Sequence, residues 1–439
     1  MTMMIDKRRV AGSLYGMLVG DALAVPGHWF YSPTKLRADY GEITGMVAPK
    51  PVHAESMVQG MSYEGTIDIM HDKAHFYEGN VLAQKAAQMR LQQQDIESLR
   101  DDHGNFVGAK ADERVHYHAS LLKGQNTVNS CLARLLMRYL AEKNLHQPDT
   151  YDPDEYLERL EIYMTTKPNA DDTSQVHFHN DIYMDFYLRQ FFTKRSNGYA
   201  LRDCALSQRD TWNIGSLDGV VMCIPMIAAY CKEPEGMVIG RAVEHHMLTH
   251  RSVTVTMVVS VLVPLLMDLW KGTNIRTALD KVMDRMRPPL ITGRQMRDSY
   301  VNHHGPGKIP KYDKWLQHML TSDESMKDFI HRMAQVENDE DVAGWGDREN
   351  SRLGTACYCE HTFSTVLFLA YKYGEADPEK ALLQNVMLGG HSTARGAVLG
   401  AILGAAHGRD GLPFVQDLCA LNSIQDEVDR LMKTVGNFS

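Results

Sequence analysis

Three polar loops with glycines in or beside them carry the residues of this sequence that are best suited to chemistry. They are GDALAVPGHWFYSP (20–33), KGQNTVNS (123–130) and GGHSTARG (389–396), and each opens or closes a strongly apolar stretch. Free backbone amides at a helix N-terminus, together with polar side chains, suit an anion or a ribose hydroxyl. Helix capping is the simpler interpretation of any one loop taken alone.

Helical periodicity dominates the elements that must position these loops, and strand alternation is hard to find. The pattern therefore predicts an almost entirely α-helical bundle. Predicted helices cover 8–24, 81–98, 127–142, 153–165, 181–193, 217–231, 237–270, 276–286, 312–335, 362–373, 378–387, 394–407 and 423–434. The stretch 32–80 is rich in Gly, Pro, Ser and His and predicts a long irregular excursion over one face.

Two of the predicted helices carry a glycine at every fourth position. The glycines are Gly12, Gly16 and Gly20 in the first helix, and Gly396, Gly400, Gly404 and Gly408 near the C-terminus. Residues four apart share a helix face, so each row forms a groove that another helix backbone can approach. Glycine costs about 1 kcal/mol relative to alanine inside a helix, so these glycines need a packing reason. We expect the two helices to be neighbours in the core, with the end of the first at 20–23 and the start of the second at 389–395 facing one cavity.

Composition and charge narrow the class of protein. A net charge of −9 with scattered Lys and Arg argues against a nucleic-acid or anionic-membrane surface. The longest apolar stretch, Val253–Met267, includes Pro264 and is too short to span a bilayer, so we expect a buried core helix. The N-terminal apolar run contains Asp21, which favours a first helix over a signal peptide. Seven cysteines, mostly in apolar segments, predict reduced thiols in a cytoplasmic protein.

The order of these motifs resembles that of the ADP-ribosylglycohydrolase family, which includes the dinitrogenase-reductase-activating glycohydrolases and the J1 crystallins. The matching segments, in chain order, are Gly20–His28 for a GDALGxPxE-like motif, Gly124–Thr127 for a TDDT-like helix start, Asp152–Glu155 for a DPEEL segment, Gly215–Pro225 for a glycine-rich helix, Leu248–His250 for an LTH helix, and Gly389–Ala394 for a GGDTDT segment. The resemblance covers most of the chain. It implies a compact, orthogonal, all-α helical bundle, one domain over residues 1–439, with a loop insertion atypical of the family at about 32–115.

The departures from the family pattern concern its metal site. The resemblance implies a pair of magnesium or manganese ions held by carboxylates of the three loops. In this sequence His28 stands at the glutamate position, Gln125 and Asn126 replace two aspartates of the second loop, and His391 and Thr393 replace two of the third. Hard divalent cations need several anionic oxygens, so a magnesium pair is not expected here.

The replacements retain hydrogen-bonding capacity and remove charge. Two interpretations of the site are compatible with them. In the first, a metal-free pocket hydrolyses a glycosidic bond, with His28 or His391 as proton carrier and Asp21 or Asp218 stabilising an oxocarbenium-like state. In the second, the two histidines hold a softer metal such as zinc with a third ligand from elsewhere. Both aspartates also have a purely structural interpretation: Asp21 could cap the first helix, and Asp218 could terminate a turn.

The resulting functional hypothesis is a hydrolase-like protein that acts on an ADP-ribosyl or related N- or O-glycosidic ligand. The alternative is a non-catalytic ligand-binding protein or a crystallin-like structural protein. Candidate ligand-binding residues are Gln125, Asn126, Thr127, Ser392, Thr393, Arg395 and Trp29, whose indole could stack on a base or a sugar.

Overall fold

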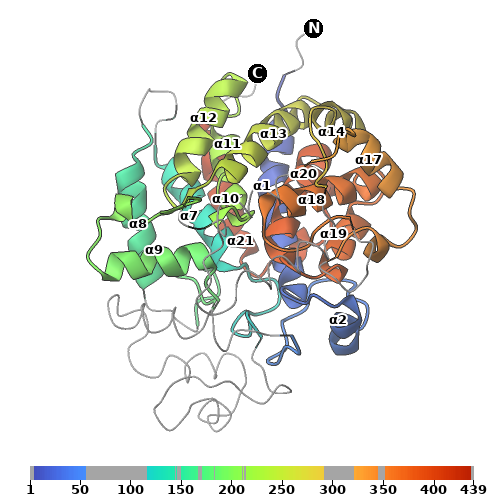
Figure 1. Cartoon of the computed structure of the whole chain (residues 1–439). Coiled ribbons are helices and arrows are strands. Elements are labelled where there is room, and N and C mark those ends of the chain that lie inside the picture. The colour runs from blue at the N-terminus through green and yellow to red at the C-terminus, as the bar shows by residue number, and fades with distance from the viewer. Residues whose placement is uncertain are drawn as a thin grey trace.

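The computed structural model describes residues 4–55, 116–143, 145, 150–166, 171–181, 183–209, 211, 214–290, 321–344 and 352–436. Within these ranges the chain is mainly helical (Figure 1). The named strands of the described part, β1 (Leu206–Ser207) and β2 (His250–Arg251), pair in parallel over two residues each. The predicted all-α fold class is therefore confirmed.

Two central helices, α1 (Lys7–Ala24) and α20 (Ser392–His407), pack backbone to backbone in the middle of the molecule (Figure 1). A Cβ atom added to Gly16 would lie 1.9 Å from the carbonyl oxygen of Gly400, and one added to Gly20 would lie 1.9 Å from that of Gly396. Only glycine allows such an approach. The two glycine rows thus face each other, as the sequence predicted, and they bring the end of α1 beside the start of α20.

The remaining helices surround this pair. They are α2 (Pro33–Tyr40), α7 (Val128–Ala141), α8 (Pro153–Thr165), α9 (Phe186–Ser196), α10 (Asp218–Val221), α11 (Ile224–Ala229), α12 (Glu235–His246), α13 (Val253–Trp270), α14 (Ile275–Met283), α17 (Met326–Met333), α18 (Cys359–Tyr373), α19 (Pro378–Met387) and α21 (Leu421–Thr434). In Figure 1, α7 to α9 lie on one side of the central pair, and α17 to α19 lie on the other.

Several predicted boundaries were wrong for local reasons. The predicted helix 237–270 is two helices, because β2 interrupts it and the Ser252 side chain then caps α13 by accepting a hydrogen bond from the Val255 amide. The stretch predicted as irregular contains α2, which begins with the same device: the Ser32 side chain accepts from the Lys35 amide. Of the predicted insertion at 32–115, residues 56–115 lie outside the described residues, as does the predicted helix 81–98.

Two helices, α1 and α13, are long and apolar enough to cross a membrane by length and composition alone. The sequence predicted that the apolar stretch Val253–Met267 is too short to span a bilayer. The structure corrects this prediction of length, because α13 continues through Trp270. The apolar window that begins in α1 is 94% buried and that of α13 is 61% buried inside the fold. Core helices of a globular protein show the same burial.

Candidate active site

The glycine pair of the third loop places this loop against the first. Gly389 and Gly390 have φ angles of 61° and 63°, in the left-handed region that favours glycine. The Gly390 amide donates to the Phe30 carbonyl at 2.6 Å, and the Trp29 amide donates to the Gly390 carbonyl at 2.7 Å. A Cβ atom on Gly389 would lie 2.0 Å from the Phe30 oxygen. The two glycines therefore serve close backbone contact, and they fix the residue that follows, His391.

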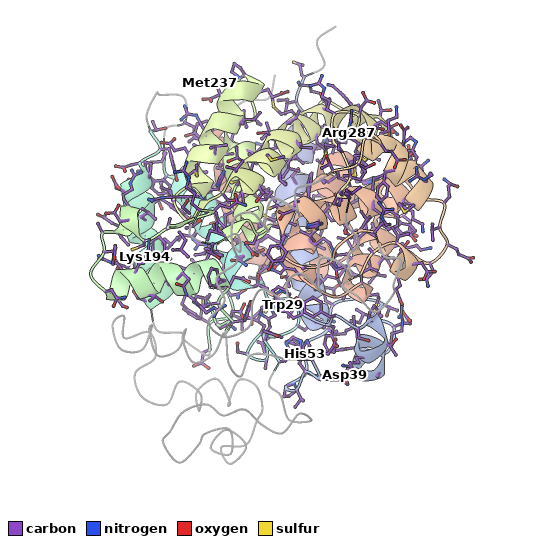
Figure 2. The ribbon with its side chains drawn as sticks, viewed as in Figure 1. Trp29, Asp39, His53, Lys194, Met237 and Arg287 are labelled. Atoms are coloured by element: carbon purple, nitrogen blue, oxygen red, sulfur yellow. The ribbon has the colours of Figure 1, made fainter. Side chains whose placement is uncertain are left out.

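This contact brings together three rings that the sequence singled out, those of His28, Trp29 and His391. The ring centroids of each pair are 4.9 Å apart, and the interplanar angles are 23° or less. Trp29 has a φ of 66°, which is uncommon for a bulky residue, and its amide donates to the Gly390 carbonyl of the third loop. Figure 2 shows Trp29 in the lower part of the helical bundle.

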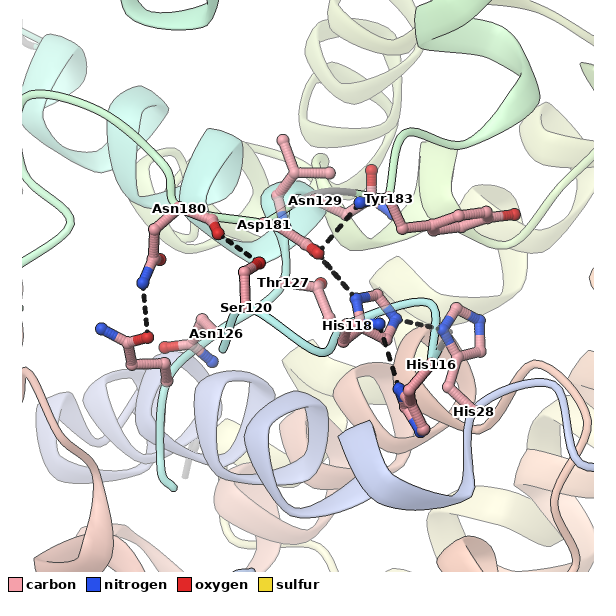
Figure 3. A network of polar contacts seen from close by, with 12 residues as sticks. His28, His116, His118, Ser120, Asn126, Thr127, Asn129, Asn180, Asp181 and Tyr183 are labelled. Carbon is pink, nitrogen blue, oxygen red and sulfur yellow. Dashed lines mark hydrogen bonds and ion pairs between the residues drawn. The ribbon is translucent and has the colours of Figure 1, made fainter. Parts of the chain in front are cut away.

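A chain of buried hydrogen bonds leads from His28 to an aspartate (Figure 3). His28 Nδ1 lies 2.5 Å from His118 Nε2, and His118 Nδ1 lies 2.8 Å and 3.0 Å from the two carboxylate oxygens of Asp181. In the tautomers in which Asp181 accepts from His118 and His118 accepts from His28, the His28 Nε2 atom retains its lone pair. This atom is buried and has no hydrogen-bond partner among the described residues. Burial, followed by the neighbouring histidines, keeps the pKa of His28 well below its ordinary value.

Two buried aspartates lie on the other side of His391. Asn129, in the first turn of α7, donates from one amide nitrogen to Asp185 Oδ2 at 2.6 Å and to Asp218 Oδ1 at 2.8 Å. The Tyr187 hydroxyl donates to the Asn129 carbonyl oxygen at 2.6 Å, which fixes the orientation of the amide. His391 Nε2 is 3.3 Å from Asp218 and 3.9 Å from Asp185. One amide therefore holds both carboxylates beside an imidazole.

The environments of the two aspartates separate their pKa values. Burial, followed by the charge of Asp218, raises the pKa of Asp185 to about 7. Burial also acts to raise the pKa of Asp218, but His391, His250 and the hydrogen bond from Ser216 together outweigh it, and the net direction is downward. Burial lowers the pKa of His391, and the two carboxylates reverse this effect and raise it. Near neutral pH, Asp218 is therefore ionised and Asp185 is the member of the pair that can hold a proton.

Asp21, predicted as a catalytic carboxylate, belongs to the first loop, and its side chain is hydrogen-bonded to the second loop. Its Oδ2 atom accepts from the Asn126 side chain and the Thr127 amide, both at 2.9 Å, and its Oδ1 atom accepts from the Thr127 hydroxyl at 2.7 Å. These bonds attach the start of α7 to the end of α1. Gln125, beside them, accepts from the Asn180 side chain, and its own Nε2 atom is buried without a hydrogen-bond partner among the described residues. Asp21, Asn126 and Thr127 thus connect the first two loops.

The polar residues at the start of α20 also have internal contacts. The Ser392 hydroxyl donates to the Ala24 carbonyl at 2.9 Å, which joins α20 to the end of α1. Arg395, predicted to bind ligand, donates through its guanidinium to Asn385, to the Thr355 carbonyl and to the Gly389 carbonyl. Burial lowers its pKa to about 9, so it still carries a charge at neutral pH. Thr393 is buried, with 1% of its surface exposed.

Sequence reasoning did not assign a role to four residues of this site: Asn129, Asp181, Asp185 and His118. His116 and His118 precede the second loop in sequence, where they could line its cavity, but a solvated turn is the simpler expectation. The structure instead buries His118, with 1% of its surface exposed. Asp185 is the N-terminal flanking residue of α9, and an aspartate before a helix ordinarily signals capping. No motif connects it to Asp218, which lies in another segment. The contacts that unite these residues are made only by the folded chain.

Two groups of residues in this region could be considered as metal ligands. At the positions where the family holds its metal pair, the chain offers His28, Gln125, Asn126, His391 and Thr393, a set without the anionic oxygens that magnesium requires. The residues present therefore do not fit that pair. Within the described part, His391 also lies beside two aspartates: ligand atoms of Asp185, Asp218 and His391 lie within 4.8 Å of one another, close enough to contact one ion. The sequence suggested a zinc site with both His28 and His391. In the described part, the cluster contains His391 but not His28.

Comparisons with known proteins identify the family of this chain and support its fold. The model of the ADP-ribosylglycohydrolase family matches residues 3–437. A solved structure titled "ADP-ribosylglycohydrolase-related protein complex" is similar with a TM-score of 0.53 and 14% sequence identity, over 98% of each chain. No curated protein matches. The family match covers nearly the whole chain, and this protein belongs to the ADP-ribosylglycohydrolase family. Membership suggests glycohydrolase-type activity on ADP-ribosyl substrates.

Proposed function

We propose that this protein hydrolyses the N- or O-glycosidic bond of an ADP-ribosyl-type ligand without the metal pair of its family, at a centre formed by Asp185, Asp218 and His391. One observation carries the proposal: the Asn129 amide holds both buried carboxylates, at 2.6 Å and 2.8 Å, while His391 lies 3.3 Å from Asp218. Two carboxyl groups with different protonation states are the usual equipment for cleaving a glycosidic bond.

The two aspartates take different roles in this proposal. Cleavage of the bond between the anomeric carbon and the leaving nitrogen or oxygen leaves positive charge on the sugar. Asp218, ionised beside His391, stabilises that charge. Asp185, whose pKa burial raises to about 7, gives its proton to the leaving atom. Asn129 keeps both groups in place, since its amide donates to each of them.

His28 completes the reaction as the proton carrier. A water molecule adds its oxygen to the anomeric carbon, and its proton passes to the His28 Nε2 atom. The bonds from His28 to His118 and from His118 to Asp181 hold the ring in the tautomer that leaves this atom unprotonated. His28 then returns the proton to the aspartate pair, which restores Asp185. The product is the free sugar hydroxyl and the protonated leaving group, so atoms and charge balance.

Trp29, Gln125 and Thr393 are proposed as ligand contacts. Trp29 contacts the rings of both His28 and His391, and its indole nitrogen is buried without a hydrogen-bond partner among the described residues. An aromatic ring of this kind can stack on a base or a sugar. Asp21, Ser392 and Arg395 are proposed as positioning residues, because their side chains are bonded to the protein itself.

The test is hydrolysis of N-linked and O-linked ADP-ribosyl compounds, with release of ADP-ribose followed by chromatography. Asp218→Asn should lower kcat by at least a hundredfold and leave the Kd for ADP-ribose nearly unchanged, because the charge it removes acts on the transition state. Asp339→Asn is the matched control: Asp339 is also buried and is paired with Lys372 at 2.7 Å, on another part of the fold. Binding without turnover, unaffected by His28→Ala or His391→Ala, would instead indicate the non-catalytic alternative.

A further inference from the structure

A cavity lies between α13, the start of α18 and the segment that follows α14. Its volume is about 480 Å³, within the range of small-molecule sites. Its walls are mostly apolar, and Met257, Val261, Met286 and Phe363 are among the lining residues. The residues of the proposed catalytic centre do not line it. Arg287, at its rim, lies in the upper part of the bundle in Figure 2, away from Trp29.

One acidic side chain, Glu360, lines this mostly apolar cavity from the first turn of α18, and two arginines, Arg285 and Arg287, line it as well. The residue is partly exposed, but its Oε2 atom is buried and has no hydrogen-bond partner among the described residues. A buried carboxylate oxygen without a partner is costly, because it loses its hydration and gains nothing in return. Burial accordingly raises the pKa of Glu360 to about 7.

The arginines at the rim do not compensate Glu360. The Arg287 guanidinium donates to the carbonyls of Asp284 at 3.2 Å and Met286 at 2.9 Å, and so binds the end of α14. Within the described ranges, neither Arg287 nor Arg285 forms an ion pair with Glu360. The carboxylate is therefore available to a group that enters the cavity from outside.

The geometry points to a second ligand site in this cavity, for an organic cation with an apolar or aromatic body and one protonated amino or amidino group that binds Glu360. The apolar body replaces water against Met257, Met286 and Phe363, and the cation supplies the donor that the Oε2 atom lacks. The exposed Met257 and Ser260 form the entrance, so a ligand can reach the cavity without opening the core.

Binding of three matched probes tests this site. 2-Phenylethylamine, 2-phenylethanol and 3-phenylpropionate share the ring and differ in the group presented to Glu360. Titration calorimetry at pH 8, where the carboxyl group is mostly ionised, should show the amine binding at least tenfold more tightly than the other two. Glu360→Gln should weaken the amine at least tenfold, to the level of the alcohol. Glu379→Gln, at the first turn of α19 and outside the cavity, is the matched control and should bind the amine as the unmodified chain does.

A second variant keeps the test informative if Glu360→Gln perturbs the cavity. Ser260→Trp places an indole at the entrance and leaves Glu360 in place, so it should abolish binding of all three probes. Equal binding of the three probes, amine binding that survives Glu360→Gln, or no amine binding by the folded unmodified chain would each overturn the proposal.

Discussion

Replacing Gly16 by alanine tests the central contact of the fold. The added Cβ atom would lie 1.9 Å from the Gly400 oxygen, whereas real Cβ atoms essentially never come closer than 3.0 Å. The two helices would therefore have to separate by about 1 Å, and the obstacle is backbone, which cannot turn aside. Overpacking of this kind costs roughly 1–3 kcal/mol or more, against which the better helix propensity of alanine returns about 1 kcal/mol.

Because the clash is with backbone atoms, we expect the upper end of this range, about 3 kcal/mol, less about 1 kcal/mol of helix propensity. Gly16→Ala should therefore lower the free energy of unfolding by about 2 kcal/mol, measured by urea denaturation followed by circular dichroism. Gly240→Ala is the matched control. Gly240 lies inside α12, and a Cβ atom there meets nothing within 4 Å, so alanine should stabilise the protein by about 0.5–1 kcal/mol. Equal effects of the two substitutions would refute the backbone-to-backbone packing of α1 and α20.

Three further predictions concern buried polar groups, each measured by denaturation. Asn129→Ala removes the donor shared by Asp185 and Asp218, so it should lower the free energy of unfolding by roughly 2–5 kcal/mol. The loss should be larger at pH 8 than at pH 5, because Asp185 ionises near pH 7. A loss that does not depend on pH would count against the carboxylate pair. Burial raises the pKa of Glu360 from 4.5 to about 7, so the folded chain favours the protonated carboxyl group. The contribution of this group to stability is therefore complete below about pH 4.5 and is lost as the pH rises through about 7. Glu360→Gln should therefore match the unmodified chain at pH 5 and exceed its stability by roughly 1–3 kcal/mol at pH 8, and a variant less stable at pH 8 would contradict this. Arg395→Lys cannot replace the guanidinium contacts to Asn385 and the backbone, so it should cost roughly 2–4 kcal/mol; a change below 0.5 kcal/mol would refute the positioning role.

Much of the architecture could be predicted from the sequence, because it rests on local signals. The helical periodicity predicted most of the helices, and the two glycine rows predicted that α1 and α20 are neighbours. The boundaries at Ser252 and Ser32 were missed, since each depends on a side chain that caps the following helix. Capping residues are common in loops, and only the fold shows which of them begin a helix.

The site was predictable only in part. His28, Trp29 and His391 were identified because they occupy positions of recognisable loops, and the structure brings their rings together. Asp185 was missed, since it reaches Asp218 only through Asn129, and these three residues come from three separate segments. A pair of carboxylates with separated pKa values is a property of burial and proximity. Spacing along the chain gives no sign of it.

The central claim is that glycosidic cleavage proceeds here without the metal pair of the family. The direct measurement is turnover of an ADP-ribosyl compound by the purified chain, before and after exhaustive chelation, with the metal content of each sample determined by mass spectrometry. The account predicts less than one equivalent of magnesium or manganese per chain and the same kcat in both samples, with turnover lost in Asp218→Asn. Two such ions per chain, whose removal abolishes turnover, would contradict it.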